Sequence, residues 1–232
     1  MAQFDTKALM VTPHPDDAEI QCGGTIAKWV KEGHRVVYVV CTSGDKGTDD
    51  PAMTPERLAT MREKEQRDAA RILGVSEVIF LRYPDGGLED TSEFRGKLAH
   101  AIRAYRPEIV MAPDPYRKGF FQHRDHRIAG IVAMDAVYPY SRDRLHFPEH
   151  EKEGLKPHKV AEIYFYGPDD PDTFVDITDT LDLKIASVMA HVCQMSNSGR
   201  DVEKWIRERA AQWGKRAEAP FAEAYRRLVA RI

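Results

Sequence analysis

The sequence predicts an α/β protein built on a doubly wound, mostly parallel β-sheet. Short runs of almost continuous apolar residues recur along the chain, and segments with helical spacing separate the first four of them. Continuous hydrophobicity is typical of strands covered on both faces, and the alternation of strand and helix is typical of a parallel sheet. The length of 232 residues suits one large domain, so we expect residues 1–232 to form a single domain.

The expected strands are rich in β-branched residues and occupy residues 8–12, 36–42, 77–81, 108–112 and 160–165. The expected helices between the first four strands occupy residues 18–32, 55–73 and 93–105. Gly33 and Gly74 follow the first two helices, where a residue with a left-handed backbone conformation commonly ends a helix. Pro107 stands just after the third helix, and proline cannot continue one.

The second half of the chain is less regular. A further helix is expected at residues 127–137, and two closing helices are expected at residues 178–194 and 202–213. Trp205 and Trp213 in the last helix have roughly helical spacing, which favours a place in the core or at an interface. The irregular segment 138–158 is consistent with a lid, an interface arm or an inert excursion.

Composition and charge exclude several classes of protein. The 34 Lys and Arg residues against 37 Asp and Glu residues give a formal net charge of −3, and the basic residues are spread along the chain. This distribution argues against nucleic acid as the main partner. We expect neither a signal peptide nor a membrane span, because the apolar stretches are too short. Three scattered cysteines, of which we interpret Cys22 and Cys41 as packing residues, suit a cytoplasmic protein with reduced thiols.

Polar residues that could carry chemistry follow the predicted strands. HPDD at residues 14–17 follows the first strand, SGDK at 43–46 the second, and YPDGG at 83–87 the third, while a long loop at 113–124 follows the fourth. In an open α/β sheet, ligands bind beyond the carboxyl ends of the strands. We therefore expect these four loops to converge on one edge of the sheet.

The HPDD stretch has two interpretations. Asp16 or Asp17 could cap the helix that starts near Ala18, since acidic residues suit the first turn of a helix. Alternatively, His14 and the two carboxylates could bind a cation, which would offset the repulsion between adjacent like charges. The pair Gly23-Gly24 is not a dinucleotide fingerprint, because the glycines come after the first turn of the helix and not before it.

A second cluster strengthens the metal interpretation. The sequence FFQHRDHRIAG contains His123, Asp125 and His126 where the long loop enters a helix. A His and an Asp from the first loop, with one His from this loop, make a three-ligand set that suits catalytic zinc with a position left for water. The remaining carboxylate and imidazole are suitable groups for acid/base hydrolysis.

These motifs together resemble those of the LmbE-like (PIG-L) family of zinc-dependent N-deacetylases. The resemblance rests on PHPDDAEI-CGGT, CTSGDKGT, H-x-D-H, a late DIT and K-x(6)-H-x-x-Q, and it extends from residue 11 to about residue 197. It implies a Rossmann-like α/β fold with C-terminal helices, a bound zinc or another divalent metal, and a homo-oligomer. It also implies an activity, the removal of the N-acetyl group from an N-acetylglucosamine-type sugar with release of acetate.

The resemblance also implies a role for each matching residue. His14, Asp17 and His126 would be the metal ligands, and Asp16 the general base. His123, oriented by Asp125, would act as an acid or stabilise the oxyanion. The family often has proline between these two residues, where this chain has Arg124, so the turn or the charge at the rim of the pocket could differ.

Three further residues have weaker assignments. The resemblance places Arg62 near the substrate, although the helical spacing favours an exposed ion pair between Arg62 and Glu65. Asp85 is either a turn residue or a hydrogen-bond partner of sugar hydroxyls. His191, seven residues after Lys184 on one helical face, is either a buried structural histidine or part of the pocket.

Other functions stay open at this point. The same loops could serve a zinc amidase that acts on a different amide-linked conjugate. A sugar-binding or metal-binding module without turnover is the alternative outside enzymes, but such a module has no need for Asp16 beside the ligands. Nucleotide binding is disfavoured because no glycine-rich phosphate loop precedes the first helix.

Overall fold

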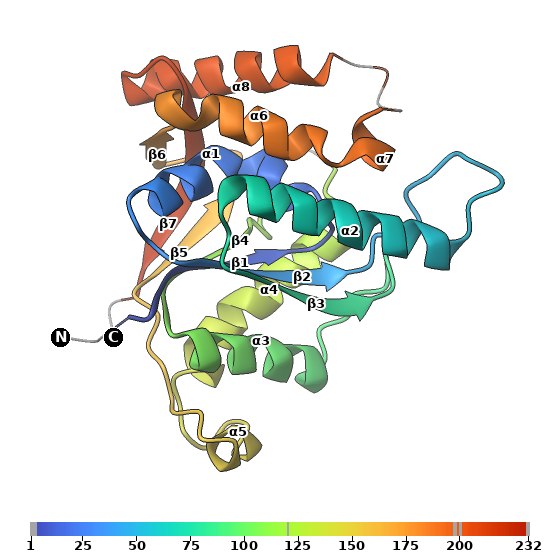
Figure 1. The fold of residues 1–232 in the computed structure, drawn as a ribbon. Helices are drawn as coiled ribbons and strands as arrows, with labels where there is room; N and C mark the ends of the chain where they lie inside the picture. The colour runs from blue at the N-terminus through green and yellow to red at the C-terminus, as the bar shows by residue number, and fades with distance from the viewer. Residues whose placement is uncertain (1–3, 120, 197–198, 200, 231–232) are drawn as a thin grey trace.

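Five parallel strands form the centre of the computed structural model, which describes residues 4–119, 121–196, 199 and 201–230 (Figure 1). Positions 120 and 197 of the expectations above lie outside these residues. The strands are β1 (Thr6–Thr12), β2 (Val36–Thr42), β3 (Glu77–Tyr83), β4 (Pro107–Pro113) and β5 (Glu162–Tyr166). All residues of β2 are buried, as continuous hydrophobicity predicts. The predicted doubly wound, mostly parallel sheet is confirmed.

Two further strands complete a seven-stranded sheet with the order β3-β2-β1-β4-β5-β7-β6. The sequence reasoning missed both of them. β6 (Thr173–Asp176) has only four residues, and β7 (Ala222–Val229) contains charged residues and ends exposed. β7 lies antiparallel between β5 and β6, so the sheet is parallel except at this end. The last part of the described chain therefore belongs to the same sheet as the first.

Helices cover both faces of the sheet (Figure 1). On one face lie α1 (Asp17–Lys31), α2 (Pro55–Leu73), α6 (Leu181–Met189) and α8 (Val202–Ala217), and on the other lie α3 (Ser92–Tyr105) and α4 (Arg124–Asp135). The segment predicted as one helix over residues 178–194 is broken into a 3₁₀ turn (Thr178–Thr180), α6 and α7 (Val192–Met195). The predicted helix over residues 127–137 starts earlier and ends in a π-helical turn (Ala136–Tyr140).

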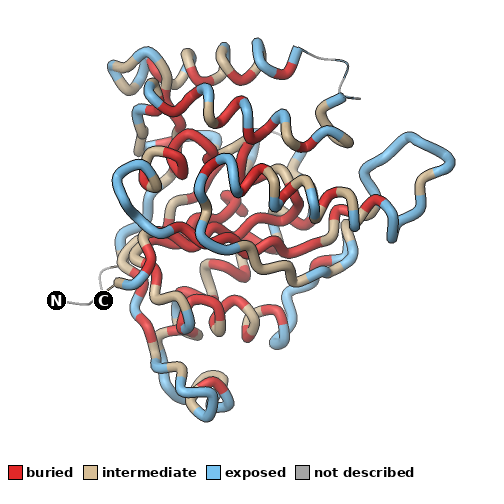
Figure 2. Tube along the Cα trace, in the orientation of Figure 1, coloured by how far each residue is buried: buried red, intermediate tan, exposed pale blue. Residues whose placement is uncertain are grey.

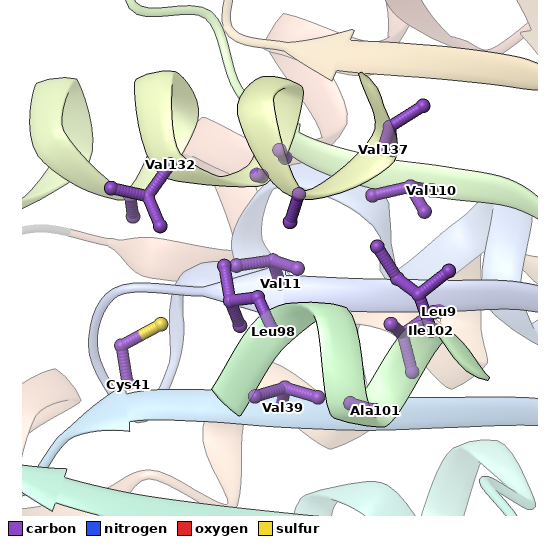
Figure 3. Packing of buried hydrophobic residues seen from close by; sticks show 14 of the residues in the cluster. Leu9, Val11, Val39, Cys41, Leu98, Ala101, Ile102, Val110, Val132 and Val137 are labelled. Atoms are coloured by element: carbon purple, nitrogen blue, oxygen red, sulfur yellow. The ribbon is translucent and has the colours of Figure 1, made fainter. Parts of the chain in front are cut away.

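The core consists of a separate apolar layer on each face, and buried residues follow the sheet through the middle of the molecule (Figure 2). In one layer, Leu98 and Ile102 of α3 and Val132 of α4 pack on Leu9 and Val39 of the sheet (Figure 3). Each such fully buried side chain stabilises the fold by roughly 1.5–3 kcal/mol. Cys22 and Cys41 are buried in these layers as free thiols, in agreement with the packing interpretation.

The irregular segment 138–158 lies away from the carboxyl ends of the strands. His158 contacts the carbonyl of Pro107, the first residue of β4, through its Nε2 atom at 2.8 Å. Arg103 of α3 is 1% exposed, and its guanidinium donates to backbone carbonyls of the segment at Tyr140, Ser141, Asp143, His146 and Phe147. These hydrogen bonds hold the segment at the edge of the sheet opposite to HPDD, so its position does not support the expectation of a lid over that site.

The loops after β1, β2, β3 and β4 converge as predicted from the parallel order. The Asp85 backbone N–H after β3 donates to the Asp45 carboxylate after β2, and His14 after β1 reaches Asp125 at the start of α4. This edge therefore positions the candidate site. Within the ranges given above, no helix is both long and apolar enough to cross a bilayer.

Candidate active site

The junction of β1 and α1 holds Asp16 in an unusual backbone conformation. Its φ of 108° lies in the left-handed region, which is costly for a residue other than glycine. Asp16 occupies the N-cap position of α1, but its side chain makes no capping hydrogen bond. The carboxylate instead lies 3.1 Å from Nη2 of Arg62. The interpretation of Asp16 as a helix cap is therefore wrong, and its carboxylate is available for another task.

Three predicted ligands lie together on two loops. The Oδ2 atom of Asp17 is 3.2 Å from Nδ1 of His14 and 3.1 Å from Nε2 of His126. One ligand atom from each residue lies within 4.8 Å of the others. Two imidazoles and a carboxylate are the donor types found in catalytic zinc sites with three protein ligands. The residues present therefore fit a divalent metal.

The second ring nitrogen of His14, Nε2, is held by two further carboxylates. Its Nε2 atom lies 3.1 Å from Asp85 Oδ1 and 3.2 Å from Asp125 Oδ2. A carboxylate that accepts the Nε2–H fixes the tautomer in which Nδ1 carries a lone pair, and this is the usual support for a metal-bound histidine. His14, Asp85, His123 and Asp125 form a second possible group. We favour the first, because Asp125 already accepts two backbone hydrogen bonds.

The electrostatics of the pocket favour a positive charge beside Asp17. Burial lowers the pKa of His14, but hydrogen bonds to Asp125, Asp17 and Asp85 outweigh it and raise this pKa to about 12. Burial also opposes ionisation of Asp17, yet His126 and His14 hold its pKa well below the usual value. A cation among these carboxylates is therefore stabilised, whether it is a proton or a metal.

The carboxylate of Asp125 does not make the expected pair with His123. It is fully buried and lies 4.0 Å from Nδ1 of His123, but it accepts hydrogen bonds from the backbone N–H groups of Gly86 and Leu88 at 2.7 and 3.1 Å. The contact that does form is made by the backbone, because the Asp125 N–H donates to His123 Nδ1. The predicted orienting role toward His123 is corrected accordingly, and the Asp125 side chain supports His14 instead.

His123 is the N-cap residue of α4 and is half exposed at the opening of the site. Because Nδ1 accepts the Asp125 N–H, the neutral ring carries its proton on Nε2. Burial and the proximity of His14 lower the pKa of His123, which favours this neutral form. The Nε2 atom lies 3.8 Å from Asp85 Oδ1, which is beyond hydrogen-bond distance, so its N–H is directed to the site as an available donor.

A buried polar network holds Asp16. Its backbone N–H donates to Oε1 of Gln66 at 3.1 Å, and Gln66 in turn donates to Glu19 at 2.9 Å. Glu19 contacts Nε2 of His191 at 3.1 Å, and Gln66, Glu19 and His191 are all fully buried. Burial raises the pKa of Asp16 to about 6, while the Arg62 guanidinium opposes this rise.

The three weaker assignments have different outcomes. Arg62 is 4% exposed and donates to the carbonyls of Pro15 and Gly44 as well as to Asp16, so it is not an exposed ion pair with Glu65. Asp85 lies at the site beside His14 and His123. His191 is enclosed by the protein, so its imidazole does not reach the opening of the site.

Sequence reasoning missed Glu19 and Gln66, although a signal was present. Glu19 follows Asp16 by three residues, and Gln66 follows Arg62 by four, which places each on the same helix face as a predicted site residue. Lys184, by contrast, belongs to the scaffold. Its ammonium bonds to Glu223 and to the carbonyl of Ile20.

A cleft opens beside His123 and His126. It has a volume of about 530 Å³ and is lined by Gln21, Arg117, Phe121, Gln122, His123, His126 and Arg209. Gln21 stands one helical turn after Asp17, so α1 supplies both a metal ligand and part of the cleft wall. A molecule held here would lie next to the candidate metal site.

Comparison with known proteins gives consistent findings. Residues 9–137 match the PIG-L family, described as GlcNAc-PI de-N-acetylase. The chain is 35% identical over 226 residues to the diacetylchitobiose deacetylase of Thermococcus kodakarensis, covering 95% of this chain and 82% of that protein. It is 31% identical over 186 residues to the 1D-myo-inositol 2-acetamido-2-deoxy-alpha-D-glucopyranoside deacetylase of Streptomyces avermitilis, covering 69% of this chain and 61% of that protein.

A solved structure agrees with these sequence matches. The N,N'-diacetylchitobiose deacetylase of Pyrococcus horikoshii superposes with a TM-score of 0.91 at 33% identity, covering 97% of this chain and 84% of that one. A TM-score of 0.91 over nearly the whole chain shows that the two chains share one fold.

Proposed function

The chain belongs to the PIG-L family of de-N-acetylases, and from this premise we propose that it is a metal-dependent hydrolase of N-acetylglucosamine-type sugars. It would cleave the amide of the acetamido group and release acetate and a free amino sugar. The observation that carries the proposal is the position of Asp16, whose carboxylate interacts electrostatically with Asp17 and His14 of the three-ligand metal set without belonging to that set.

His14, Asp17 and His126 would hold the metal, with Asp125 and Asp85 supporting His14. We propose zinc, because imidazole and carboxylate donors in a three-ligand set suit it, although other divalent metals accept the same ligands. When bound, such a metal polarises the amide carbonyl and lowers the pKa of a coordinated water toward neutrality.

Asp16 would act as the general base. Arg62 and Gln66 hold it from two sides, through the carboxylate and the backbone N–H, and so fix the direction of the carboxylate. It would accept a proton from the attacking water and return it to the nitrogen when the carbon–nitrogen bond breaks. The same proton thus serves both steps, and the products are acetate and an amine.

His123 would stabilise the oxyanion. Its Nε2–H is directed to the site while its Nδ1 is occupied by the Asp125 N–H, so the ring can donate without being protonated. The lowered pKa of His123 supports this role better than that of a general acid, because a neutral imidazole can donate a hydrogen bond from Nε2 but is too weak an acid to transfer that proton.

Three other features complete the proposal. β7 near the end of the described chain pairs with β5, which supports residues 1–232 as one domain. A homo-oligomer is proposed from the family resemblance, and a cytoplasmic location is proposed from the three scattered, free cysteines. A zinc amidase for another conjugate and a binding module without turnover are the alternatives that the following experiment separates.

The test is a product assay on a panel of N-acetylglucosamine derivatives and other acetamido conjugates. We expect acetate and the free amine from the metal-loaded protein, no product after removal of the metal by a chelator, and recovery when zinc is added back. The variant Asp16→Asn serves as the catalytic control. Binding of a panel member without release of acetate from any of them would contradict the proposal and favour a binding module.

A further inference from the structure

Two side chains of opposite charge reach the backbone of α1 from other parts of the fold. The ammonium of Lys184, on α6, donates a hydrogen bond to the carbonyl of Ile20 at 2.8 Å. The carboxylate of Glu223, on β7, accepts hydrogen bonds from the backbone N–H groups of Gly24 and Thr25 at 3.0 and 2.8 Å. Lys184 and Glu223 also bond to each other, and they are 5% and 4% exposed. A buried ion pair is therefore bound directly to the middle of the helix.

The ion pair divides α1 into two segments. In a regular helix the Gly24 N–H donates to the Ile20 carbonyl, four residues earlier. Here the N–H donates to Glu223, and the carbonyl accepts from Lys184. The cation lies at the C-terminal end of the first segment and the anion at the N-terminal end of the second. Because the helix dipole favours this arrangement at both ends, the pair stabilises the division.

The glycines of the CGGT motif allow these close contacts. A Cβ on Gly23 would lie 3.1 Å from Cγ of Lys184, and a Cβ on Gly24 would lie 2.7 Å from the side chain of Ile177. The hydroxyl of Thr180, just before α6, donates to the Gly24 carbonyl at 2.8 Å. The motif therefore serves the close packing of α6 and the turn before it on α1.

The first segment of α1 carries residues of the candidate site. Its first residue, Asp17, places Oδ2 at 3.2 Å from His14 and 3.1 Å from His126. The Ile20 N–H donates to the carbonyl of Asp16 at 3.0 Å and so closes the single turn that holds both aspartates. Since the carbonyl of the same Ile20 accepts from Lys184, a shift of the ion pair would move this turn.

Building on the proposed function, we propose that Lys184 and Glu223 are positioning residues for the metal ligand Asp17. They act through the backbone of α1 and not by contact with the metal or the substrate. Burial of two charges removes their hydration, and an apolar pair of similar size often gives equal or greater stability. What the charges add here is direction, because one fixes a carbonyl and the other fixes two N–H groups of the helix.

The experiment measures zinc affinity by competition with a chelator, which needs no substrate. The double variant Lys184→Met with Glu223→Gln removes both charges and so leaves no buried charge unpaired. We expect its zinc affinity to fall by about 10-fold, the lower end of the effect of residues that orient metal ligands. The free energy of unfolding of the chelator-treated protein should stay close to that of the parent. The kcat at saturating zinc should also fall, because Asp16 belongs to the same turn.

Two matched variants separate positioning from the mere loss of an ion pair. Arg227→Met with Glu162→Gln removes a pair that joins β7 to β5, so the contacts of α1 stay in place and the zinc affinity should be unchanged. Lys184→Arg keeps the charge and a donor for Ile20. A cavity of about 20 Å³ beside Lys184 and Glu223 gives the larger head group room. This conservative variant should retain most of the zinc affinity.

Gly23→Ala tests the same point with both charges in place. The added methyl would press on the stem of Lys184 and displace it. Alanine favours a helix more than glycine does, so the variant should fold. We expect a weaker zinc affinity than in the parent, which unfolding would not explain. This variant decides the question if the double variant is unfolded.

A parent-level zinc affinity in the folded double variant would overturn the inference, as would the same affinity in Gly23→Ala if the double variant is unfolded. An equal loss in the Arg227 and Glu162 control would also overturn it, because any ion pair would then have the same effect. A parent protein that binds zinc but releases no acetate would contradict the proposed function and leave the positioning result standing. A parent that binds no divalent metal would overturn both.

Discussion

The Nε2 atom of His14 lies 3.2 Å from the carboxylate of Asp125, a residue with no exposed surface. Asp125 also accepts hydrogen bonds from Gly86 and Leu88, so it connects the loop after β3 with the loop after β1. The position of a candidate metal ligand therefore depends on a residue of a different motif. The HPDD motif and the motif at residues 123–126 therefore depend on each other for their positions in the site.

Replacing Asp125 by asparagine should weaken metal binding. Asparagine cannot accept the His14 Nε2–H and keep both backbone hydrogen bonds, so the ring loses its orientation. Supporting carboxylates of this kind typically contribute about 10- to 100-fold to metal affinity. The measurement is zinc affinity by competition with a chelator. His34→Gln, a change of an exposed histidine after α1, is the control. An unchanged affinity would show that Asp125 does not position His14 for metal binding.

Replacing Asp16 by asparagine should leave the metal content unchanged and reduce turnover. An amide cannot accept a proton from water, and the loss of a positioned general base typically lowers the rate by about 10²- to 10⁴-fold. Elemental analysis and kcat are measured on the same sample. His126→Ala is the contrasting variant, since it should lose metal and activity together. Parent-level turnover by metal-loaded Asp16→Asn would assign the base to another group.

The parts of the fold that could be predicted depend on local chemistry. The predicted bounds of α2 agree with the structure at both ends, because Pro55 begins the helix and Gly74 ends it in a left-handed conformation. β2 was predicted at its observed bounds because every residue is apolar or β-branched and both faces are covered. β7 was not predicted, because its place between β5 and β6 depends on distant segments.

In the candidate site, too, some features follow from local sequence patterns and others depend on contacts between distant segments. The proximity of His14, Asp17 and His126 was predicted, because the loops after parallel strands converge on one edge of the sheet and the family resemblance implies these three residues as ligands. The partner of Asp125 was not predicted. Its carboxylate lies 3.2 Å from His14 and 4.0 Å from His123, and the sequence cannot resolve so small a difference in distance. Arg117 and Arg209 line the same cleft although they lie far apart in the sequence, and no local pattern indicates this.

Replacing Gln66 by leucine should reduce kcat through the position of Asp16. Leucine cannot bind the Asp16 N–H, whose strained backbone then has less support. Small displacements of a catalytic group can lower rates by up to about 100-fold, so we expect a loss of 10- to 100-fold with KM and metal content unchanged. Arg67→Gln, on the exposed face of α2, is the control. The fraction of unfolded variant is measured by urea titration. If that fraction accounts for the whole loss of kcat, Gln66 has only a structural role.

Replacing Arg103 by methionine should destabilise the fold without affecting the site. The change leaves several carbonyls of segment 138–158 without their donor, and each unsatisfied buried group costs roughly 1–3 kcal/mol. We expect the free energy of unfolding in urea to fall by about 3 kcal/mol or more. Lys97→Met, which removes an exposed ion pair on the same helix, should change it by about 1 kcal/mol or less. A matching loss of kcat in the folded protein would place this segment near the substrate after all.

The last prediction concerns His158 and the pH dependence of stability. Burial lowers the pKa of His158 despite its hydrogen bond to Pro107, so the folded state favours the neutral ring. The unfolded chain binds a proton near the ordinary histidine pKa of 6.5. The stabilisation is therefore complete above that pH and is lost as the pH falls toward the lower pKa of the folded state. The free energy lost is about 1.4 kcal/mol for each pKa unit between the unfolded and the folded state.

Chelator-treated parent and His158→Gln should be unfolded in urea at pH 7.5 and pH 5.5. Glutamine keeps a donor for the Pro107 carbonyl but does not titrate, so the variant should lose less stability than the parent on acidification. His34→Gln, which changes an exposed histidine, should follow the parent. Because the metal ligands titrate equally in all three proteins, the difference between their slopes isolates His158. Parallel slopes for parent and His158→Gln would show that this buried ring takes up its proton at the same pH in the folded and unfolded states.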